Sequence, residues 1–204
     1  VKDNKIDLEI NISESEKLYV EKINISGNYS TLEEVIRNNL IVDEGDPFNE
    51  ILFNKSINNL KSLGIFKKVN TDIKDGSDNS LKVVDIEIEE RPSGEISLTA
   101  GFGTTGEIIG AGIKEKNFLG KGINLDTNIE LTPESIKGRF IYAKPNFNNT
   151  DNTLFTSLKS STNDVLTNSG YKTSELGFSF GTKFEQYQNI FLSPEIDFLL
   201  EDLE

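Results

Sequence analysis

The sequence contains no cysteine, no histidine, no tryptophan and no methionine. Without cysteine, neither a disulfide framework nor a thiolate metal site can form. Without histidine, the commonest general base and metal ligand is missing, and so are the usual Ser–His and Cys–His nucleophile pairs. No segment resembles an enclosed pair of carboxylates. We therefore expect no enzyme activity, no catalytic residue, no metal site and no cofactor.

The charge is one-sided, and long apolar runs are missing. The 204 residues carry 34 acidic and 21 basic side chains, which gives a formal net charge of −13. Phosphate binding along a nucleic acid needs a clustered basic face, so the balance argues against a nucleic-acid partner. No run of 18 apolar residues occurs, which excludes a membrane-spanning helix. A negative mean hydropathy still allows a membrane barrel, whose strands are apolar on one side only.

Both ends of the sequence look internal. Val1 is not a translation start, because the chain has no methionine at all. Residues 189–204 have the pattern of a strand that simply stops. We therefore expect the chain to be a piece of a larger protein.

The first half predicts a small α+β domain. Alternating apolar residues indicate strands, and apolar residues spaced three and four apart indicate helices. Ser30 and Glu33 fit a capping box at a helix start, and Gly64 fits the position just after a helix end. The expected elements are strands at 18–26, 65–74 and 81–90, with helices at 31–40 and 49–63 after the first strand. A further alternating strand is predicted at 5–12.

The second half predicts strands only. Residues 95–103 place Ile96, Leu98, Ala100 and Phe102 on one face, and the segments 121–131, 174–184 and 190–201 repeat this alternation. A soluble β-sandwich alternates in the same way and is the alternative. The opposite face, however, carries charge on strand after strand, as a water-filled lumen allows. The pattern favours an antiparallel transmembrane β-barrel, of which about seven strands are present. The charged positions are Asp126, Glu130, Glu175, Lys183 and Asp197.

The turns between these strands alternate in kind. Those at 117–122, 144–152 and 183–189 contain phenylalanine or tyrosine, whereas those at 104–106, 132–135 and 163–170 contain no aromatic residue. Aromatic residues gather where a barrel meets the membrane surface. If the first strand rises from the periplasm, the aromatic turns lie at the periplasmic rim.

Residues 18–91 resemble a POTRA domain. The family pattern is a strand ending in Gly-Asn, a helix, a Glu-Gly-Asp loop, a second helix ending in Leu-x-x-Leu-Gly, and then an aromatic residue before Phe-x-x-Val. The matching positions are Gly27, Asn28, Glu44, Gly45, Leu60, Leu63, Gly64, Phe66 and Val69. Residues 1–17 resemble the last strand of a preceding POTRA repeat, which implies a tandem array upstream.

The segment after the domain is similar to the point where the last POTRA domain of outer-membrane protein assembly factors meets the first barrel strand. Asn117, Leu119, Gly120 and Gly122 match the Asn-x-Leu-Gly-x-Gly element of that family. The turn at 141–147 resembles its Pro-Tyr-Phe turn, although Asn146 stands where tyrosine is common. That departure leaves the subfamily open. The resemblance implies that residues 92–204 are the truncated N-terminal part of the barrel.

The resemblance also implies a function. The protein would be the central subunit of the machine that folds and inserts β-barrel clients into the outer membrane, by templating their strands at an edge of the POTRA sheet and at barrel strand one. The alternative is a related translocation or two-partner secretion transporter that exports a client through the lumen. The expected location is the cell outer membrane, with the POTRA domain in the periplasm. Expected partners are unfolded outer-membrane protein clients, outer-membrane lipoprotein subunits and the lipid bilayer.

Three groups of residues carry this expectation. The first is the lateral-gate strand, whose glycines would weaken the barrel seam or, alternatively, allow curvature and close packing. The second is a POTRA edge strand to which a client adds. The third is a pair of charges that faces the lipoprotein, or is merely solvated surface. The three groups are Glu95, Ile96, Ser97, Leu98, Thr99, Ala100, Gly101, Phe102 and Gly103; Phe66, Lys67, Lys68, Val69, Asn70 and Thr71; and Arg37 and Glu44.

Overall fold

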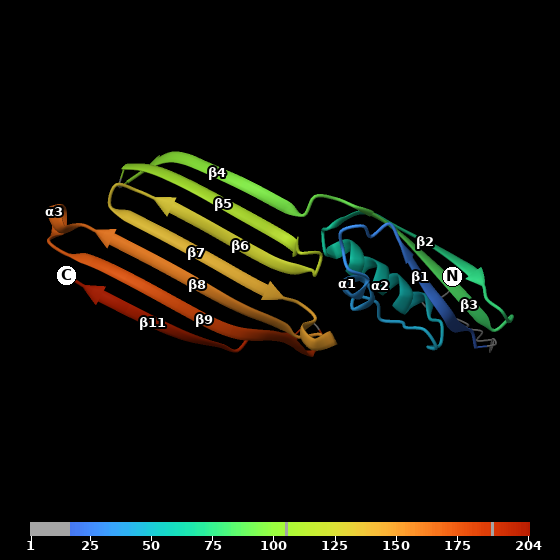
Figure 1. Ribbon diagram of the computed structural model, residues 1–204. Helices are drawn as coiled ribbons and strands as arrows, with labels where there is room; N and C mark the ends of the chain where they lie inside the picture. The colour runs from blue at the N-terminus through green and yellow to red at the C-terminus, as the bar shows by residue number, and fades with distance from the viewer. Residues whose placement is uncertain (1–16, 105, 189) are drawn as a thin grey trace, which may run out of the picture.

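A computed structural model describes residues 17–204 except 105 and 189. The chain has two parts, an α+β domain at the N-terminal side and one broad curved sheet (Figure 1). The strand predicted at 5–12, and the preceding POTRA repeat predicted for residues 1–17, lie outside the described residues apart from Lys17. Among the described residues, no helix has the length and apolar character needed to cross a membrane.

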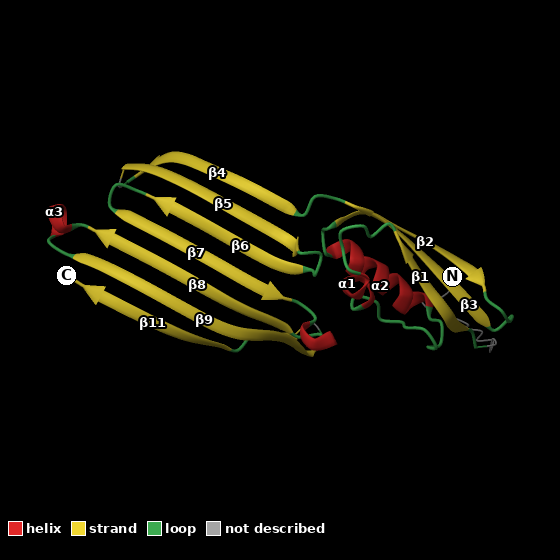
Figure 2. Cartoon of the chain, in the orientation of Figure 1, coloured by secondary structure: helices red, strands yellow, loops and turns green. Residues whose placement is uncertain are grey.

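The α+β domain has the predicted element order β-α-α-β-β. Its sheet order is β1-β3-β2, with β3 in the middle, parallel to β1 and antiparallel to β2. Both helices lie on one side of this sheet (Figure 2). The elements are β1 (Tyr19–Ser26), α1 (Glu33–Arg37), α2 (Glu50–Ser62), β2 (Phe66–Asp75) and β3 (Leu81–Glu90).

Helix α1 is shorter than predicted, and the predicted capping box does not form. The N-cap residue is Leu32, which makes no side-chain cap. The amides of Ser30 and Thr31 instead donate to the two carboxylate oxygens of Glu90, at 2.9 and 2.7 Å. The spacing from Ser30 to Glu33 was a valid local signal, but a carboxylate from β3 satisfies these amides instead.

The domain has its own hydrophobic core between the sheet and the helices. The side chains of Ile36 and Leu60 are fully buried where α1 and α2 face the sheet. A core contained within one segment is the usual mark of a domain that can fold alone. The buried cluster is Val20, Ile23, Ile36, Val42, Phe53, Ile57, Leu60, Ile65, Phe66, Val69, Val84, Ile86 and Ile88.

The second part is one antiparallel sheet rather than two stacked sheets, so the sandwich alternative is wrong. Strands β4 to β9 each pair with the next, and both β10 and β11 pair with β9. The predicted last strand is thus interrupted between Leu192 and Glu195. The sheet is not closed within residues 17–204 as the structure describes them. The strands are β4 (Gly94–Gly103), β5 (Gly106–Phe118), β6 (Ile123–Leu131), β7 (Ser135–Lys144), β8 (Thr153–Asp164), β9 (Lys172–Tyr187), β10 (Ile190–Leu192) and β11 (Glu195–Leu203).

The two faces of this sheet differ in chemistry. The strand register aligns apolar residues on one face, including Ile96, Leu98 and Phe102, which are 77, 82 and 86% exposed. The other face carries ion pairs between neighbouring strands, Lys114–Asp126 at 3.7 Å and Lys137–Glu130 at 4.0 Å. So large an exposed apolar surface is unusual for a soluble protein and suits contact with lipid.

The three aromatic turns lie at the end of the sheet nearest the α+β domain (Figure 1). They join β5 to β6, β7 to β8 and β9 to β10, and the second contains the short 3₁₀ helix η1 (Phe147–Asn149). The β6–β7 and β8–β9 turns lie at the far end, and the β8–β9 turn contains helix α3 (Leu166–Ser169). The sheet therefore presents its aromatic rim to the α+β domain.

Candidate functional site

One edge of the α+β sheet is sealed by the chain itself. The loop after α1 runs alongside β1 and forms backbone hydrogen bonds with it. Gly45 N donates to Val20 O at 2.7 Å, and Val20 N donates to Asp46 O at 2.9 Å. Phe48 N donates to Leu18 O at 2.8 Å. These bonds occupy the outer backbone groups of β1, so another strand cannot add there without displacing the loop.

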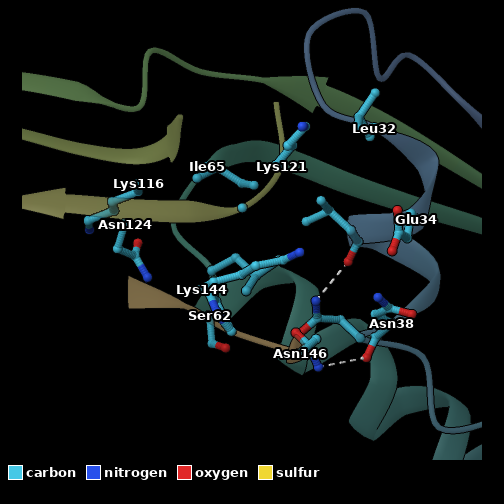
Figure 3. Close-up of a pocket in the computed structure, with 15 residues that line it drawn as sticks. Leu32, Glu34, Asn38, Ser62, Ile65, Lys116, Lys121, Asn124, Lys144 and Asn146 are labelled. Atoms are coloured by element: carbon cyan, nitrogen blue, oxygen red, sulfur yellow. Dashed lines mark hydrogen bonds between the residues drawn. The ribbon is translucent and has the colours of Figure 1, made fainter. Parts of the chain in front are cut away.

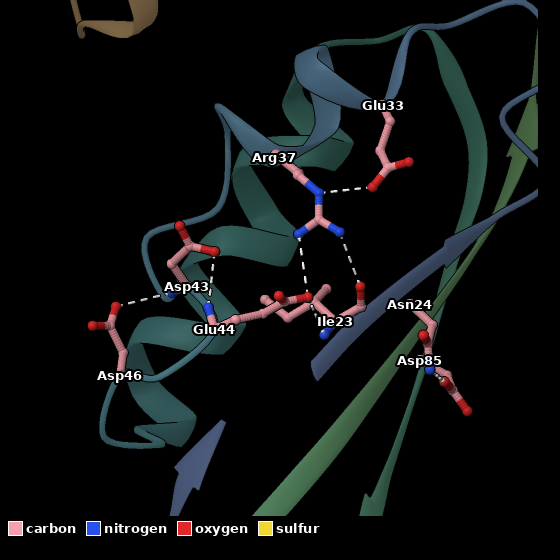
Figure 4. Close-up of polar contacts among 8 residues, drawn as sticks. All are labelled: Ile23, Asn24, Glu33, Arg37, Asp43, Glu44, Asp46 and Asp85. Atoms are coloured by element: carbon pink, nitrogen blue, oxygen red, sulfur yellow. Dashed lines mark hydrogen bonds and ion pairs between the residues drawn. The ribbon is translucent and has the colours of Figure 1, made fainter. Parts of the chain in front are cut away.

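Arg37 and Glu44 extend the sealed edge of β1 from Val20 to Ile23 (Figure 4). Glu44 Oε1 accepts a hydrogen bond from Ile23 N at 2.9 Å, and Arg37 Nη2 donates one to Ile23 O at 3.1 Å. Arg37 also pairs with Glu44 at 3.6 Å and with Glu33 at 2.7 Å. The two side chains therefore satisfy the backbone of β1 as a neighbouring strand would. The sequence indicated only that these charges face a lipoprotein or are solvated, and it gave no sign that they bond the backbone of β1.

The other edge of the α+β sheet is open. Strand β2 pairs with β3 on one side, and within the described part of the chain no strand pairs with its other side. Phe66 and Val69 point into the core, whereas Lys67, Lys68, Asn70 and Thr71 are exposed. The predicted edge strand is thus at an edge of the sheet.

The lysines of β2 lean inward over β3 rather than outward over the open edge. Lys67 and Lys68 both pair with Glu89, and the hydrogen bond from Lys67 holds the pKa of Glu89 below its usual value. Lys74 bonds Asp85 at 2.5 Å and lowers the pKa of that carboxyl in the same way. The lysines that usually protect an edge strand are therefore engaged elsewhere, and the outer backbone of β2 is left accessible.

Strand β4 forms the corresponding edge of the large sheet. Its partner β5 pairs with it along the whole length from Gly94 to Gly103, and its other side is unpaired within the described residues. A Cβ at Gly101 would meet nothing within 4 Å, and a Cβ at Gly103 would meet the flexible end of Ile108 at 2.9 Å and the backbone oxygen of Gly106 at 4.0 Å. Close packing therefore does not explain these two glycines.

The α+β domain and the large sheet are joined by a hydrogen-bonded junction. Leu32 N donates to Gly120 O at 2.8 Å, and Asn117 Nδ2 donates to Thr31 Oγ1 at 2.8 Å. Asn117 Oδ1 in turn accepts from Gly122 N at 2.8 Å, which closes the turn. We call the contact between residues 27–32 and residues 117–122 the junction.

Glu90 stabilises the α+β side of the junction, because its carboxylate accepts hydrogen bonds from the amides of Ser30 and Thr31. Burial alone would raise the pKa of Glu90, but the hydrogen bonds from Thr31 and Ser30 outweigh it and hold the pKa below its usual value. The carboxylate is therefore charged at neutral pH, when it can accept both bonds.

The junction explains the glycines of the Asn-x-Leu-Gly-x-Gly element. Gly120 has a φ of +71°, and a Cβ there would lie 2.1 Å from Ser30 O. Gly122 has a φ of +64°, and its Cβ would lie 3.0 Å from Val35 Cγ1. Only glycine fits the backbone and the space at Gly120. Leu119, by contrast, is 69% exposed.

A second contact uses the residue that departs from the family turn. Asn146 has a φ of +50°, and its Nδ2 donates to Asn38 O at 3.3 Å, just after α1. Asn38 Nδ2 donates to Asn149 Oδ1 at 3.2 Å. Asparagine tolerates this left-handed backbone better than tyrosine does. Asn146 thus suits a turn that is bonded to the α+β domain.

Comparison with known families identifies the first part of the chain. The family described as "Surface antigen variable number repeat", POTRA, matches residues 18–91. The chain is 31% identical over 139 residues to a "Putative outer membrane protein assembly factor" of Treponema pallidum, covering 64% of this chain and 16% of that protein. It is 28% identical over 144 residues to "Outer membrane protein assembly factor BamA" of Neisseria meningitidis, covering 70% and 18%. The chain thus spans less than a fifth of these relatives.

Solved structures share the fold of both parts. BamA from Haemophilus ducreyi lacking POTRA domains 1–3 aligns with a TM-score of 0.78 at 23% identity, over 92% of this chain and 36% of that one. CdiB from Acinetobacter baumannii aligns with a TM-score of 0.64 at 15% identity, over 92% and 39%. Residues 18–91 thus match the POTRA family, and the chain as a whole has the fold of these solved structures.

Proposed function

We propose that this chain belongs to an outer-membrane protein assembly factor that templates client strands. The observation that carries the proposal is the contrast between the two edges of the POTRA sheet, with β1 sealed by the loop at 43–48 and β2 open. An extended client segment can add to an open edge by β-augmentation, in which backbone hydrogen bonds give affinity for many sequences. The curated relatives named as assembly factors support the same reading.

The mechanism needs two edges and no catalytic group. A client strand first adds to β2 at Phe66–Thr71, and then meets β4 at Glu95–Gly103. There it replaces the strand that closes the barrel. Gly101 and Gly103 weaken this seam because they offer no side chain to pack across it. Folding of the client supplies the driving force, since backbone groups left unpaired in lipid cost several kcal/mol each.

The proposed location is the outer membrane, with the POTRA domain in the periplasm. The apolar face of the large sheet then contacts lipid, and the charged face lines the lumen. The partners are unfolded outer-membrane protein clients and lipoprotein subunits of the assembly complex.

Client crosslinking tests the choice of edge. A photoreactive amino acid placed at Asn70 or Thr71 in β2 should crosslink an unfolded client, because the neighbouring backbone is free to pair. The same amino acid at Glu21 or Lys22 in β1 should crosslink at background level, because the loop at 43–48 occupies that edge. Crosslinked client is measured by gel shift in the intact protein. Equal yields from the two strands would contradict templating at β2.

Lipoprotein docking at Arg37 and Glu44 is part of the proposal. Two substitutions of Glu44 distinguish a role in docking from a role in folding. Glu44→Gln keeps an oxygen that can accept from Ile23 N, but it removes the charge. Glu44→Lys removes the acceptor and places a cation beside Arg37. Loss of a charged interface contact typically costs about 2 kcal/mol, or roughly thirtyfold in affinity. Both variants should therefore lose lipoprotein co-purification.

The free energy of unfolding distinguishes the two variants. Glu44→Lys alone should lower it, by about 1–3 kcal/mol, since Ile23 N loses its partner. The measurement is denaturant unfolding of each variant beside its co-purification. Normal lipoprotein binding by Glu44→Gln would mean that Glu44 serves only to seal β1.

The second candidate function is a POTRA–barrel transporter that exports a client through the lumen. The fold likeness to CdiB is the observation in its favour. Such a protein has no need to open the seam at β4, whereas an assembly factor does, so a locked seam separates the two functions.

A further inference from the structure

A cavity of about 440 Å³ lies between the POTRA domain and the barrel turns that face it (Figure 3). Helix α1 and the end of α2 form one wall. The end of β5, the β5–β6 turn and the β7–β8 turn form the other. The cavity therefore exists only where the two parts of the chain meet.

The cavity is basic, although the chain is acidic. Lys116, Lys121 and Lys144 line it from three separate segments, and Glu34 is the single acidic residue in its lining. The whole chain, by contrast, has 34 acidic and 21 basic residues. Such a local excess of lysine raises the concentration of anions at the cavity.

The lysines of the cavity are not used in ion pairs. Within the described part of the chain, no acidic group lies within 4 Å of the ammonium of any of the three. On the POTRA sheet, Lys74 and Lys82 are both paired with aspartates. The cations at the cavity are therefore available to a ligand.

The three lysines differ in their surroundings. Lys116 Nζ lies close to Gly64, near the end of α2, where the helix dipole attracts a cation. Lys144 is half-buried, lies over the ring of Phe147 at 5.7 Å, and extends into the cavity in Figure 3. Lys121 projects from the turn above it (Figure 3). Lys116 thus lies at the C-terminal end of a helix, whereas Lys121 and Lys144 are the two cations without such a partner.

We propose that this cavity binds a phosphate group, carried by a phospholipid headgroup or present as free phosphate. Ammonium groups bind phosphate oxygens as point charges, and Lys121 and Lys144 would neutralise it from two sides. Asn124 adds an amide that donates no hydrogen bond within the described residues. The cavity lies beside Phe147 in the aromatic rim, the level at which a barrel meets lipid headgroups. All three lysines belong to the barrel wall, so a phosphate there is held by the barrel turns and faces polar side chains of the POTRA wall such as Asn38, Asn39 and Ser62.

Amine acetylation of the full-length protein tests the free-phosphate arm. The protein in a neutral detergent is treated with an acetylating reagent, in phosphate or in chloride of equal ionic strength. Modification of each lysine is then measured by mass spectrometry. Phosphate should slow the modification of Lys121 and Lys144 by about threefold or more, and leave Lys159 unchanged. Glu34→Gln should strengthen this protection, because the one carboxylate in the lining is removed.

Retained lipid tests the headgroup arm. The protein is extracted from bilayers that contain phosphatidylglycerol, and bound lipid is counted by native mass spectrometry. The wild type should keep more lipid than the Lys121→Gln/Lys144→Gln variant, whereas Lys67→Gln on the far face should keep as much as the wild type. Protection by phosphate alone assigns the site to a small anion, and lipid retention alone assigns it to a headgroup. Equal acetylation in both salts, together with equal lipid retention in all variants, would overturn the proposal.

Discussion

Replacing Gly120 by valine should separate the POTRA domain from the barrel rim. The valine Cβ would lie 2.1 Å from Ser30 O, and the φ of +71° is one that a β-branched residue rarely adopts. The backbone term alone costs about 1–2 kcal/mol, and the overlap cannot be relieved without breaking the bond from Leu32 N to Gly120 O. We therefore expect amide exchange at Leu32 to increase by at least about tenfold, a change of about 1.4 kcal/mol.

Gly170 provides the matched control for this substitution. It has a similar φ of +77°, but a Cβ there would meet nothing within 4 Å, at the far end of the sheet. Gly170→Val therefore introduces the same backbone strain without the overlap. It should leave exchange at Leu32 and the assembly of clients unchanged, whereas Gly120→Val should reduce assembly severely. Equal effects of the two variants would show that the junction has no role.

The sequence predicted the POTRA domain well because its signals are local. The helix spacing at 49–63 and the Gly64 end both matched α2, since a packed amphipathic helix needs only its own apolar stripe. Alternation likewise predicted the barrel strands. It could not show where a strand breaks, so β10 and β11 were predicted as one. Nor could the capping pattern at Ser30 reveal that Glu90, 60 residues later, takes its place.

The site was less predictable, because it depends on contacts between distant segments. No periodicity indicates that Asn117 bonds Thr31 or that Gly120 touches Ser30. The motif around Asn117 is visible in the sequence only as a family resemblance. The structure explains it, because Asn117 and Gly120 contact residues 30–32 of the α+β domain. The same holds for Arg37 and Glu44. The family resemblance indicated a lipoprotein partner for these two residues, whereas in the structure they form hydrogen bonds with the backbone of Ile23.

Locking the seam at β4 should reduce client assembly more than any other change. A client strand cannot pair with β4 while the strand that closes the intact barrel holds the same backbone groups. A cysteine within 95–103, joined by a disulfide to that closing strand, should therefore abolish client assembly. The chain has no native cysteine that could form a competing bond.

The control lock uses the other side of β4, which never needs to open. Thr99 is paired with Gly110 of β5, and a Cβ built on Gly110 would lie 3.5 Å from the Cβ of Thr99. That separation suits a disulfide. The Thr99→Cys/Gly110→Cys variant should therefore form a disulfide within the barrel and keep its assembly activity.

Assembly of a client barrel into liposomes by the two locked proteins, before and after reduction, tests the proposed function most directly. We predict no assembly with β4 locked to the closing strand, recovery on reduction, and near-normal assembly with β4 locked to β5. Full assembly by the protein with its closing seam locked would contradict strand templating at β4, and would favour a protein that works through its lumen.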